Sequence, residues 1–409
     1  MSEVPGAWAR AARGAMLLSD AGDLRPSIFA EMSALAIRTG ALNLGQGFPD
    51  YDGPPEVLAA ARQAIAEGLN QYPPGLGMPV LREAIARHQQ RFYGQVVDPD
   101  REVLVTVGAT EAIAATLLAL LEPGDEVVTF EPFYDSYAAI IALAGARHVT
   151  VPMPAPGFAP DLDALRDAVS DRTRLILLNS PHNPTGTVVA DEALRLIVEL
   201  ADRHDAVIVS DEVYEHLTFD RPHVPIATLP GAAARTVTIS SGGKTFNTTG
   251  WKIGWLIAPP PIRDAILAVK QFLTFVSGSP FQPAIAAGLD LPDAYFSDAA
   301  AALQERCVRL SAGLASAGFT VSTPQGGYFV IGDAAPLGYD DSLAFCRDLP
   351  DLIGVVAVPL SAFVRPENAA GYRSLVRFAF CKRDEVVDEG VARLRLLAEK
   401  GGRTDPSAH

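Results

Sequence analysis

Residues 240–255 read SSGGKTFNTTGWKIGW, and the rest of the chain is best understood from this stretch. A strand-like run, Thr236–Ile239, leads directly into its serines and glycines. Residues this small allow backbone and hydroxyl groups to approach a ligand closely. Lys244 follows them and could hold a phosphate, form a Schiff base or remain an exposed charge, which is the usual state of a lysine. The other motifs of the chain indicate which of these roles Lys244 has.

Length and composition describe an acidic globular protein with a large core. The 409 residues are 49% hydrophobic and 20% charged, which suits two or three domains. A net charge of −15 repels phosphate backbones and argues against a nucleic-acid partner. Cys307, Cys346 and Cys381 show no metal-binding spacing, which favours buried thiols in a reducing compartment. Without a membrane-length apolar run or a signal-peptide core, we expect a cytoplasmic protein with no membrane partner and no metal.

From about residue 100, short apolar runs alternate with helix-like segments. Continuous apolar runs are typical of strands that are buried on both faces. The predicted strands are Val103–Val107, Glu126–Phe130, Leu175–Leu178, Val207–Val209, Val237–Ile239 and Trp255–Ala258. The predicted helices between them are Glu111–Leu121, Ser136–Ala144, Asp161–Val169 and Asp191–His204. This order predicts an α/β domain with a mainly parallel sheet covered by helices.

The two ends of the sequence predict a second, smaller α+β domain. Residues 1–25 have the composition of a flexible arm, and a helix is expected over Ser27–Arg38. After Pro280, alternating strands at 326–330 and 375–380 precede a final helix. The predicted division is an N-terminal arm and part of the small domain at 1–50, a large domain at 51–285, a C-terminal small domain at 286–400 and a disordered tail at 401–409.

Polar side chains follow each predicted strand, at the sheet edge where ligands bind in open α/β sheets. Gly108-Ala109-Thr110 opens a helix with Thr110 as a candidate N-cap, although such turns usually just begin a helix. Tyr134 could pack in the core or stack on a flat ligand. Asn179 and Asn183 flank a turn, and Asp211 needs a partner if it is buried.

One ligand requires all of these groups together, and that ligand is pyridoxal 5′-phosphate. It needs a lysine for a Schiff base and a carboxylate that keeps its ring nitrogen protonated. It also needs an aromatic side chain over the ring, donors to its phenolic oxygen and a cup for its phosphate. Each motif alone has a plain structural explanation, but their joint occurrence in this order favours the cofactor.

The same motifs, in this order, resemble those of a known family. Gly108-Ala109-Thr110, Tyr134, Asn183-Pro184, Asp211-x-x-Tyr214 and Ser241-x-x-Lys244 are similar to the class I/II aminotransferases of PLP fold type I, over residues 24–399. Residues 43–49, 134–137 and 180–184 resemble the kynurenine/methionine/glutamine aminotransferase branch. Residues 70–75 and 381–384 are similar to its actinobacterial members described as N-succinyldiaminopimelate aminotransferases.

The resemblance implies a role for each matching residue. Lys244 would form the Schiff base and move the substrate proton, while Asp211 would pair with the ring nitrogen. Tyr214 and Asn183 would donate to the phenolic oxygen, and Tyr134 would stack on the ring. The implied phosphate ligands are Ala109, Thr110, Ser241 and Lys252, with Tyr72 reaching in from the second subunit of a homodimer. The implied substrate ligands are Arg377, Asn179, Gly47 and Phe29, with Gln46 and Tyr328 as weaker candidates.

The activity implied is ping-pong transfer of an amino group between an amino acid, expected to be glutamate, and a 2-keto acid. N-succinyl-LL-2,6-diaminopimelate:2-oxoglutarate transamination, a step of lysine biosynthesis, is the expected specific reaction. Kynurenine-type enzymes often carry an aromatic or imidazole group where this chain has Gly278, which predicts a wider pocket here.

Three alternatives remain open from the residues alone. A kynurenine-, glutamine- or methionine-type transaminase or a cysteine-S-conjugate β-lyase would use the same lysine and cofactor. Ser241 and Lys244 also match the S-x-x-K pattern of serine acyl-enzymes, but the other elements of that class are missing. A regulator built on this fold would carry a DNA-binding domain and a basic surface.

Overall fold

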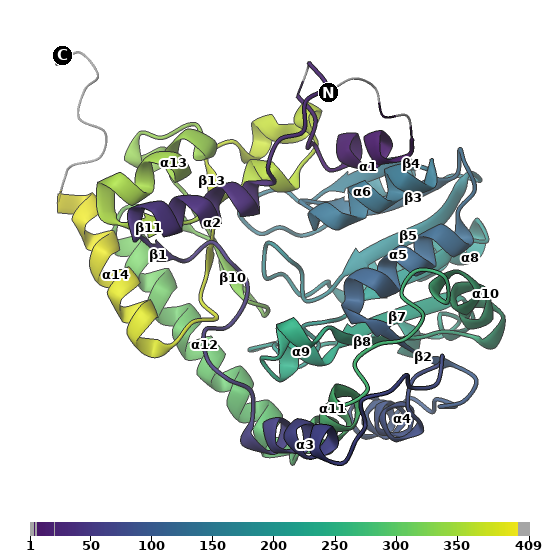
Figure 1. Cartoon of the computed structure of the whole chain (residues 1–409). Helices are drawn as coiled ribbons and strands as arrows, with labels where there is room; N and C mark the ends of the chain where they lie inside the picture. Colours follow the sequence, from purple (N-terminus) through teal and green to yellow (C-terminus); the bar gives the residue numbers. More distant parts are fainter. Residues whose placement is uncertain (1–3, 5, 20, 400–409) are drawn as a thin grey trace.

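A seven-stranded sheet forms the centre of the computed structural model, which describes Val4 and residues 6–19 and 21–399 (Figure 1). In spatial order its strands are β2 (Val103–Val107), β8 (Ile253–Ile257), β7 (Thr236–Ser241), β6 (Val207–Asp211), β5 (Thr173–Asn179), β3 (Glu126–Glu131) and β4 (Arg147–Pro152). Neighbours from β7 to β4 are parallel, whereas β8 runs antiparallel to both β2 and β7. The predicted mainly parallel sheet is confirmed, with one reversed strand.

The six predicted strands all occur, but β4 is absent from the prediction. It lies at the edge of the sheet, and most of its residues are partly or fully exposed. An edge strand that begins with Arg147 and His148 lacks the continuous apolar run of the inner strands, which are buried on both faces. The other edge strand, β2, is almost fully buried and is predicted, so the sequence pattern detects burial rather than position in the sheet.

Helices cover both faces of the sheet. On one face, α5 (Gly108–Leu120), α6 (Asp135–Ala144) and α10 (Pro260–Lys270) share a core with side chains of β5 to β8. On the other, α3 (Pro55–Ala66), α4 (Pro79–Tyr93) and α11 (Phe281–Leu289) pack over β2 and β8, and α7 (Leu162–Ala168) and α8 (Asp191–Arg203) pack over the remaining strands. Among the described residues, no helix has the length and apolarity needed to cross a membrane.

The smaller unit combines segments from opposite ends of the sequence. Its four-stranded sheet has the order β12 (Val358–Pro359), β13 (Leu375–Ala379), β10 (Phe329–Asp333) and β9 (Thr320–Val321). Its helices are α2 (Ile28–Thr39), α12 (Asp293–Ser316), α13 (Ser342–Ile353) and α14 (Asp384–Glu399), and Figure 1 shows α2 beside α13. Strand β1 (Leu42–Asn43) pairs in parallel with β11 (Val355–Val356), so residues after α2 belong to this unit. The domain boundaries remain predictions, and the predicted tail at 401–409 lies outside the described residues.

The first part of the chain is a docked helix where a flexible arm is expected. Helix α1 (Trp8–Gly14) packs against α6, and Arg10 Nη2 donates to the Leu143 carbonyl over 3.3 Å. A Cβ added to Gly14 would lie 2.4 Å from the Ala138 carbonyl oxygen, so only glycine allows this close approach. The expectation of a flexible arm over residues 1–25 is therefore wrong for α1.

Candidate active site

One cavity, of about 340 Å³, lies at the carboxyl ends of the parallel strands and reaches the small domain. Fourteen of the predicted site residues line it: Phe29, Gln46, Gly47, Ala109, Thr110, Tyr134, Asn179, Asn183, Asp211, Tyr214, Ser241, Lys244, Lys252 and Arg377. The strand register explains part of this arrangement, because Asn179 at the end of β5 lies directly beside Asp211 at the end of β6. Tyr72 lies outside this cavity with 83% of its surface exposed, as a residue that serves a second subunit would.

Lys244 enters the cavity from the single helical turn α9 (Gly242–Thr245), directly after β7. Its Nζ lies 3.4 Å from the Gly47 carbonyl, and the Tyr214 and Tyr328 rings lie 5.7 and 5.6 Å away. Burial lowers the pKa of Lys244, with Asp211 and Cys381 opposing the shift. An amine with a lowered pKa is neutral more often, as a nucleophile or a proton acceptor must be.

The tight turn around Lys244 depends on its glycines for different reasons. Gly243 lines the cavity, but a Cβ on Gly242 would lie 2.6 Å from Ile285 Cδ1, so Gly242 permits packing against α11. The Tyr328 hydroxyl donates to the Lys244 carbonyl over 2.7 Å and fixes the backbone of the turn. In the described part of the chain, Ser241 makes no hydrogen bond to Lys244, so nothing observed activates Ser241 as a nucleophile.

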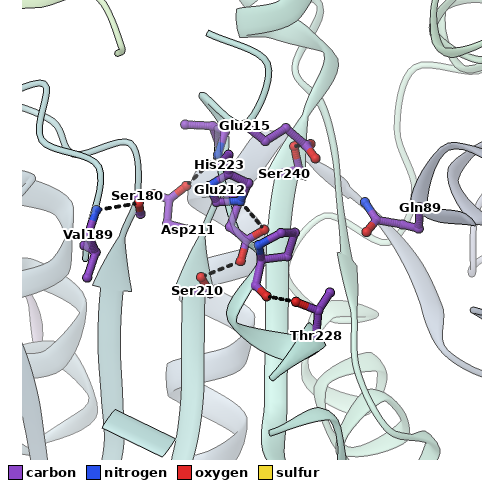
Figure 2. A network of polar contacts seen from close by, with 12 residues as sticks. Gln89, Ser180, Val189, Ser210, Asp211, Glu212, Glu215, His223, Thr228 and Ser240 are labelled. Atoms are coloured by element: carbon purple, nitrogen blue, oxygen red, sulfur yellow. Dashed lines mark hydrogen bonds and ion pairs between the residues drawn. The ribbon is translucent and has the colours of Figure 1, made fainter. Parts of the chain in front are cut away.

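Asp211 is a buried carboxylate at the end of β6, 5% exposed (Figure 2). Its Oδ2 accepts from the Tyr137 hydroxyl at 2.7 Å, and its Oδ1 lies 3.4 Å from the Val213 amide nitrogen. Within the described residues it forms no ion pair, and burial raises the pKa of Asp211 to about 6. A buried carboxylate without a cationic partner fits the protonated ring nitrogen of the expected cofactor.

Tyr137 is a functional candidate for which the sequence predicts no role, although it belongs to the 134–137 motif. The available signal is its place in the first turn of α6, directly after the cap residue Tyr134. Tyr134 faces the cavity, and the two rings meet edge to face at 5.7 Å. The Tyr137 hydroxyl therefore orients the carboxylate that would face the ring nitrogen.

We expect Tyr137→Phe to reduce turnover by about tenfold or more, the usual effect of losing a partner that orients a ligand. The hydroxyl lowers the pKa of Asp211, so its loss should also move the acid limb of the pH–rate profile to higher pH. Tyr372→Phe is the matched control, since it removes a buried hydroxyl that contacts the Glu131 and Met153 carbonyls instead. An unchanged rate and pH profile in Tyr137→Phe would contradict the role assigned to this hydroxyl.

Arg377 projects from β13 into the cavity and is 2% exposed. Its Nη1 donates to Asn183 Oδ1 at 3.0 Å and its Nη2 to the Gly45 carbonyl at 2.8 Å. Burial lowers the pKa of Arg377 to about 10, and within the described chain it has neither an acidic ion-pair partner nor a hydrogen bond at Nε. A buried guanidinium with no anion is suited to a carboxylate from a substrate.

Aromatic rings and a glycine shape the walls around Arg377. The guanidinium carbon lies 3.9 Å from the centre of the Phe329 ring, 4.6 Å from that of Phe363 and 5.3 Å from that of Phe29. A Cβ on Gly47 would lie 2.2 Å from Phe329 Cζ, so this position requires glycine for steric reasons. Because Asn183 Oδ1 is held by Arg377, the amide nitrogen of Asn183 remains to donate to an oxygen of a ligand.

The opposite end of the cavity suits an anion. Ala109 and Thr110 lie in the first turn of α5, and Ser241 and Lys252 line the cavity beside it. The predicted N-cap at Thr110 is wrong, because the cap residue is Val107 and the helix begins at Gly108, three residues earlier than predicted. Gly108 has φ +72°, and a Cβ there would lie 3.2 Å from Lys252 Nζ. A helix N-terminus, a hydroxyl and a lysine around an open cradle fit a phosphate group.

Gly278 does not line the cavity of this chain, within the described residues. Its backbone has φ +53°, and an added Cβ would lie 2.6 Å from Ile253 Cδ1. The wider pocket expected from Gly278 therefore stays a prediction about the side of the site that a second subunit would form.

Comparisons with known proteins agree with this geometry. A sequence model of the family described as Aminotransferase class I and II matches residues 39–394. The chain is 54% identical over 389 residues to a probable N-succinyldiaminopimelate aminotransferase of Mycobacterium tuberculosis. The match covers 92% of this chain and 98% of the relative. It is 39% identical over 376 residues to a methionine aminotransferase of Escherichia coli, covering 91% and 96% of the two chains.

Solved structures of aminotransferases superpose on most of this chain. The structure of N-succinyldiaminopimelate aminotransferase from Mycobacterium tuberculosis superposes with a TM-score of 0.88 at 54% identity, over 91% of this chain and 97% of that one. An aspartate aminotransferase from Thermus thermophilus, solved with maleate, superposes with a TM-score of 0.84 at 33% identity, over 91% and 97% of the chains.

Proposed function

Because the chain belongs to the class I and II aminotransferase family and uses pyridoxal phosphate, we propose that it transfers an amino group from glutamate to the keto acid that corresponds to an N-succinylated diamino acid, and that it catalyses the reverse reaction with 2-oxoglutarate as acceptor. One observation carries this proposal: an amine (Lys244), an unpaired carboxylate (Asp211) and an unpaired guanidinium (Arg377) all face one cavity. The high identity to the mycobacterial relative, over nearly the whole of both chains, supports the choice of substrate.

Each residue that lines the cavity has a separate role in the proposed reaction. When bound, pyridoxal phosphate supplies an electron sink for the negative charge that develops at the substrate Cα. Lys244 Nζ accepts the proton from Cα and returns it during the transfer, and Arg377 holds the α-carboxylate. Asp211, oriented by Tyr137, keeps a negative charge next to the ring nitrogen. Ala109, Thr110, Ser241 and Lys252 line the end of the cavity where they would hold the phosphate, and Tyr134 would lie against the ring.

A ping-pong order is supported by the single carboxylate-binding residue. Among the described cavity residues the cations are Lys244, Lys252 and Arg377, and only Arg377 lies at the substrate end. The donor and the acceptor would therefore use the same guanidinium in turn, with the first keto acid leaving before the acceptor enters. The succinyl carboxylate would be bound near the mouth of the cavity, or by the second subunit.

A second candidate function, transamination of an apolar or aromatic amino acid, is favoured by the aromatic side chains that line the cavity. Phe29, Phe48 and Phe329 line the cavity and suit an apolar or aromatic side chain, as a methionine- or kynurenine-type substrate has. β-Elimination from cysteine S-conjugates would use the same residues. Activity assays, rather than the position of any one side chain, separate these reactions.

The test compares amino donors and acceptors with the purified, cofactor-loaded enzyme. With N-succinyl-LL-2,6-diaminopimelate and 2-oxoglutarate we expect a kcat/KM at least about tenfold above those for methionine, kynurenine and glutamine, since pocket contacts commonly discriminate by that much. Initial rates at several fixed acceptor concentrations should give parallel double-reciprocal lines. Preference for methionine or kynurenine would move the assignment to the second candidate, and pyruvate release from cysteine conjugates without transamination would overturn both.

A homodimer with shared sites is part of the proposal. Tyr72 and Phe272 are each 83% exposed, and Phe275 is 46% exposed and lies edge to face with Tyr72. Exposed aromatic side chains that gather in this way are typical of protein interfaces. A cytoplasmic location is supported by Cys307, Cys346 and Cys381, which are all buried and free.

A further inference from the structure

A second group of ligand-type side chains lies behind the active site, and we call His88, Glu215 and His216 the His88 cluster. His88 comes from α4, whereas Glu215 and His216 follow Tyr214 in the turn after β6. One ligand atom from each residue lies within 4.8 Å of the others. His88 and Glu215 are 2% and 4% exposed, whereas His216 is only partly buried.

Glu215 directs an unused oxygen atom into this buried space. Its Oε1 accepts from the Ser240 hydroxyl at 2.5 Å, and Figure 2 shows Ser240 and Glu215 side by side. In the part of the chain that the structure describes, Oε2 is buried and meets no donor in good hydrogen-bond geometry, while the Tyr93 hydroxyl lies near this carboxylate. A buried carboxylate oxygen without a partner is costly, and a bound cation would remove that cost.

The two histidines present neutral nitrogen atoms to each other. Their Nε2 atoms are 2.5 Å apart, so both rings direct a nitrogen atom at the same point. The Gln89 amide lies 3.5 Å from His88 Nδ1, and with its oxygen turned that way it would accept a hydrogen bond from Nδ1–H and leave the Nε2 lone pair free. Two imidazole nitrogens on one tetrahedral zinc ion lie about 3.3 Å apart, so the rings would separate by less than about 1 Å.

We propose that His88, Glu215 and His216 bind a zinc ion. Two neutral imidazoles and one carboxylate are a donor set that zinc prefers, and water or a further side chain would complete four-coordination. The partly exposed His216 offers a path of entry. The ion would link α4 to the turn that carries Tyr214, so its role is to fix the wall behind the cavity. This site is separate from the proposed transamination and does not depend on it.

The charges around the cluster are already compensated. Glu212 is held by His223, with Oε2 and Nε2 2.8 Å apart. Arg91, whose charge acts on both histidines of the cluster, forms an ion pair with Asp293. The remaining negative charge of Glu215 is therefore available to a cation.

The first test is zinc binding to the metal-free, cofactor-loaded enzyme, measured by competition with a chromophoric chelator. We expect one tight zinc ion per chain, with an affinity that falls at least about tenfold in Glu215→Gln and in His88→Gln. His148→Gln is the matched control, because His148 is also largely buried but contacts Thr129 instead.

A second measurement does not depend on whether the variants fold. Crystals of the unaltered enzyme soaked in zinc should show an anomalous peak at the zinc absorption edge between His88 Nε2, His216 Nε2 and Glu215. Absence of that peak, or zinc binding that Glu215→Gln and His88→Gln leave unchanged, would overturn the proposal. A negative result in the transamination assay would not bear on zinc binding, because the two proposals are independent.

Discussion

Lys244→Ala should abolish turnover, with a loss of at least about 10⁴-fold, because it removes both the covalent attachment point and the group that moves the α-proton. The variant should still fold, because burying the Lys244 amine costs free energy. In the described chain that amine makes a single hydrogen bond, to the Gly47 carbonyl, which is 3.4 Å long. Steady-state rates with the best donor and acceptor measure the effect. A small primary amine added to the variant should restore part of the proton transfer.

Lys270→Met is the matched control for this prediction. Lys270 is a second buried lysine, 1% exposed, and it donates to the Phe275 carbonyl outside the cavity. Substantial activity in Lys244→Ala, or an equal loss in Lys270→Met, would contradict the role of Lys244.

Asp211→Asn should reduce turnover by about 10²–10³-fold, the usual effect of removing one electrostatic stabiliser from an active site. An amide keeps the shape of the side chain and can still accept from Tyr137, but it cannot place a negative charge beside the ring nitrogen. Affinity for the cofactor should also fall. Single-turnover rates and cofactor titrations measure the two effects, and a variant with normal values of both would remove Asp211 from the site.

The same variant tests the pH dependence of the cofactor-free protein. The folded-state pKa of Asp211, about 6, lies above its ordinary value, so the folded state binds the proton more tightly than the unfolded chain. Stability should therefore rise by on the order of 1 kcal/mol between pH 7 and pH 5 relative to Asp211→Asn. In the unaltered protein, cofactor affinity should weaken below about pH 6, where Asp211 becomes protonated. If the free energy of unfolding changed with pH in the same way in both proteins, Asp211 would not titrate between pH 7 and pH 5.

The sequence predicts the core of the site because of one geometric rule. Parallel strands end at the same edge of a sheet, so side chains that follow separate strands, such as Asn179, Asp211 and Ser241, come together although many residues separate them. Lys244 follows the same rule, since α9 continues directly from β7. Arg377 comes from the small domain, so its place was predicted from family resemblance and not from this rule.

Other features could not be predicted because they depend on packing between distant segments. The glycine at position 47 lies in a loop and is required by the ring of Phe329, which belongs to β10. Helix α5 begins at Gly108, where positive φ brings the chain against Lys252, and no propensity rule places that start before Thr110. His88 and His216 are 128 residues apart and share no motif, so only the fold shows that they meet.

The most direct test of this account is the site of attachment of pyridoxal phosphate. Reduction of the cofactor-loaded enzyme with borohydride, followed by peptide mapping by mass spectrometry, should place the reduced cofactor on the peptide that contains Lys244, and Lys244→Ala should carry none. A label on Lys252 or another lysine, or a label on Ser241 by a serine-directed reagent in an enzyme that binds no pyridoxal phosphate, would contradict it.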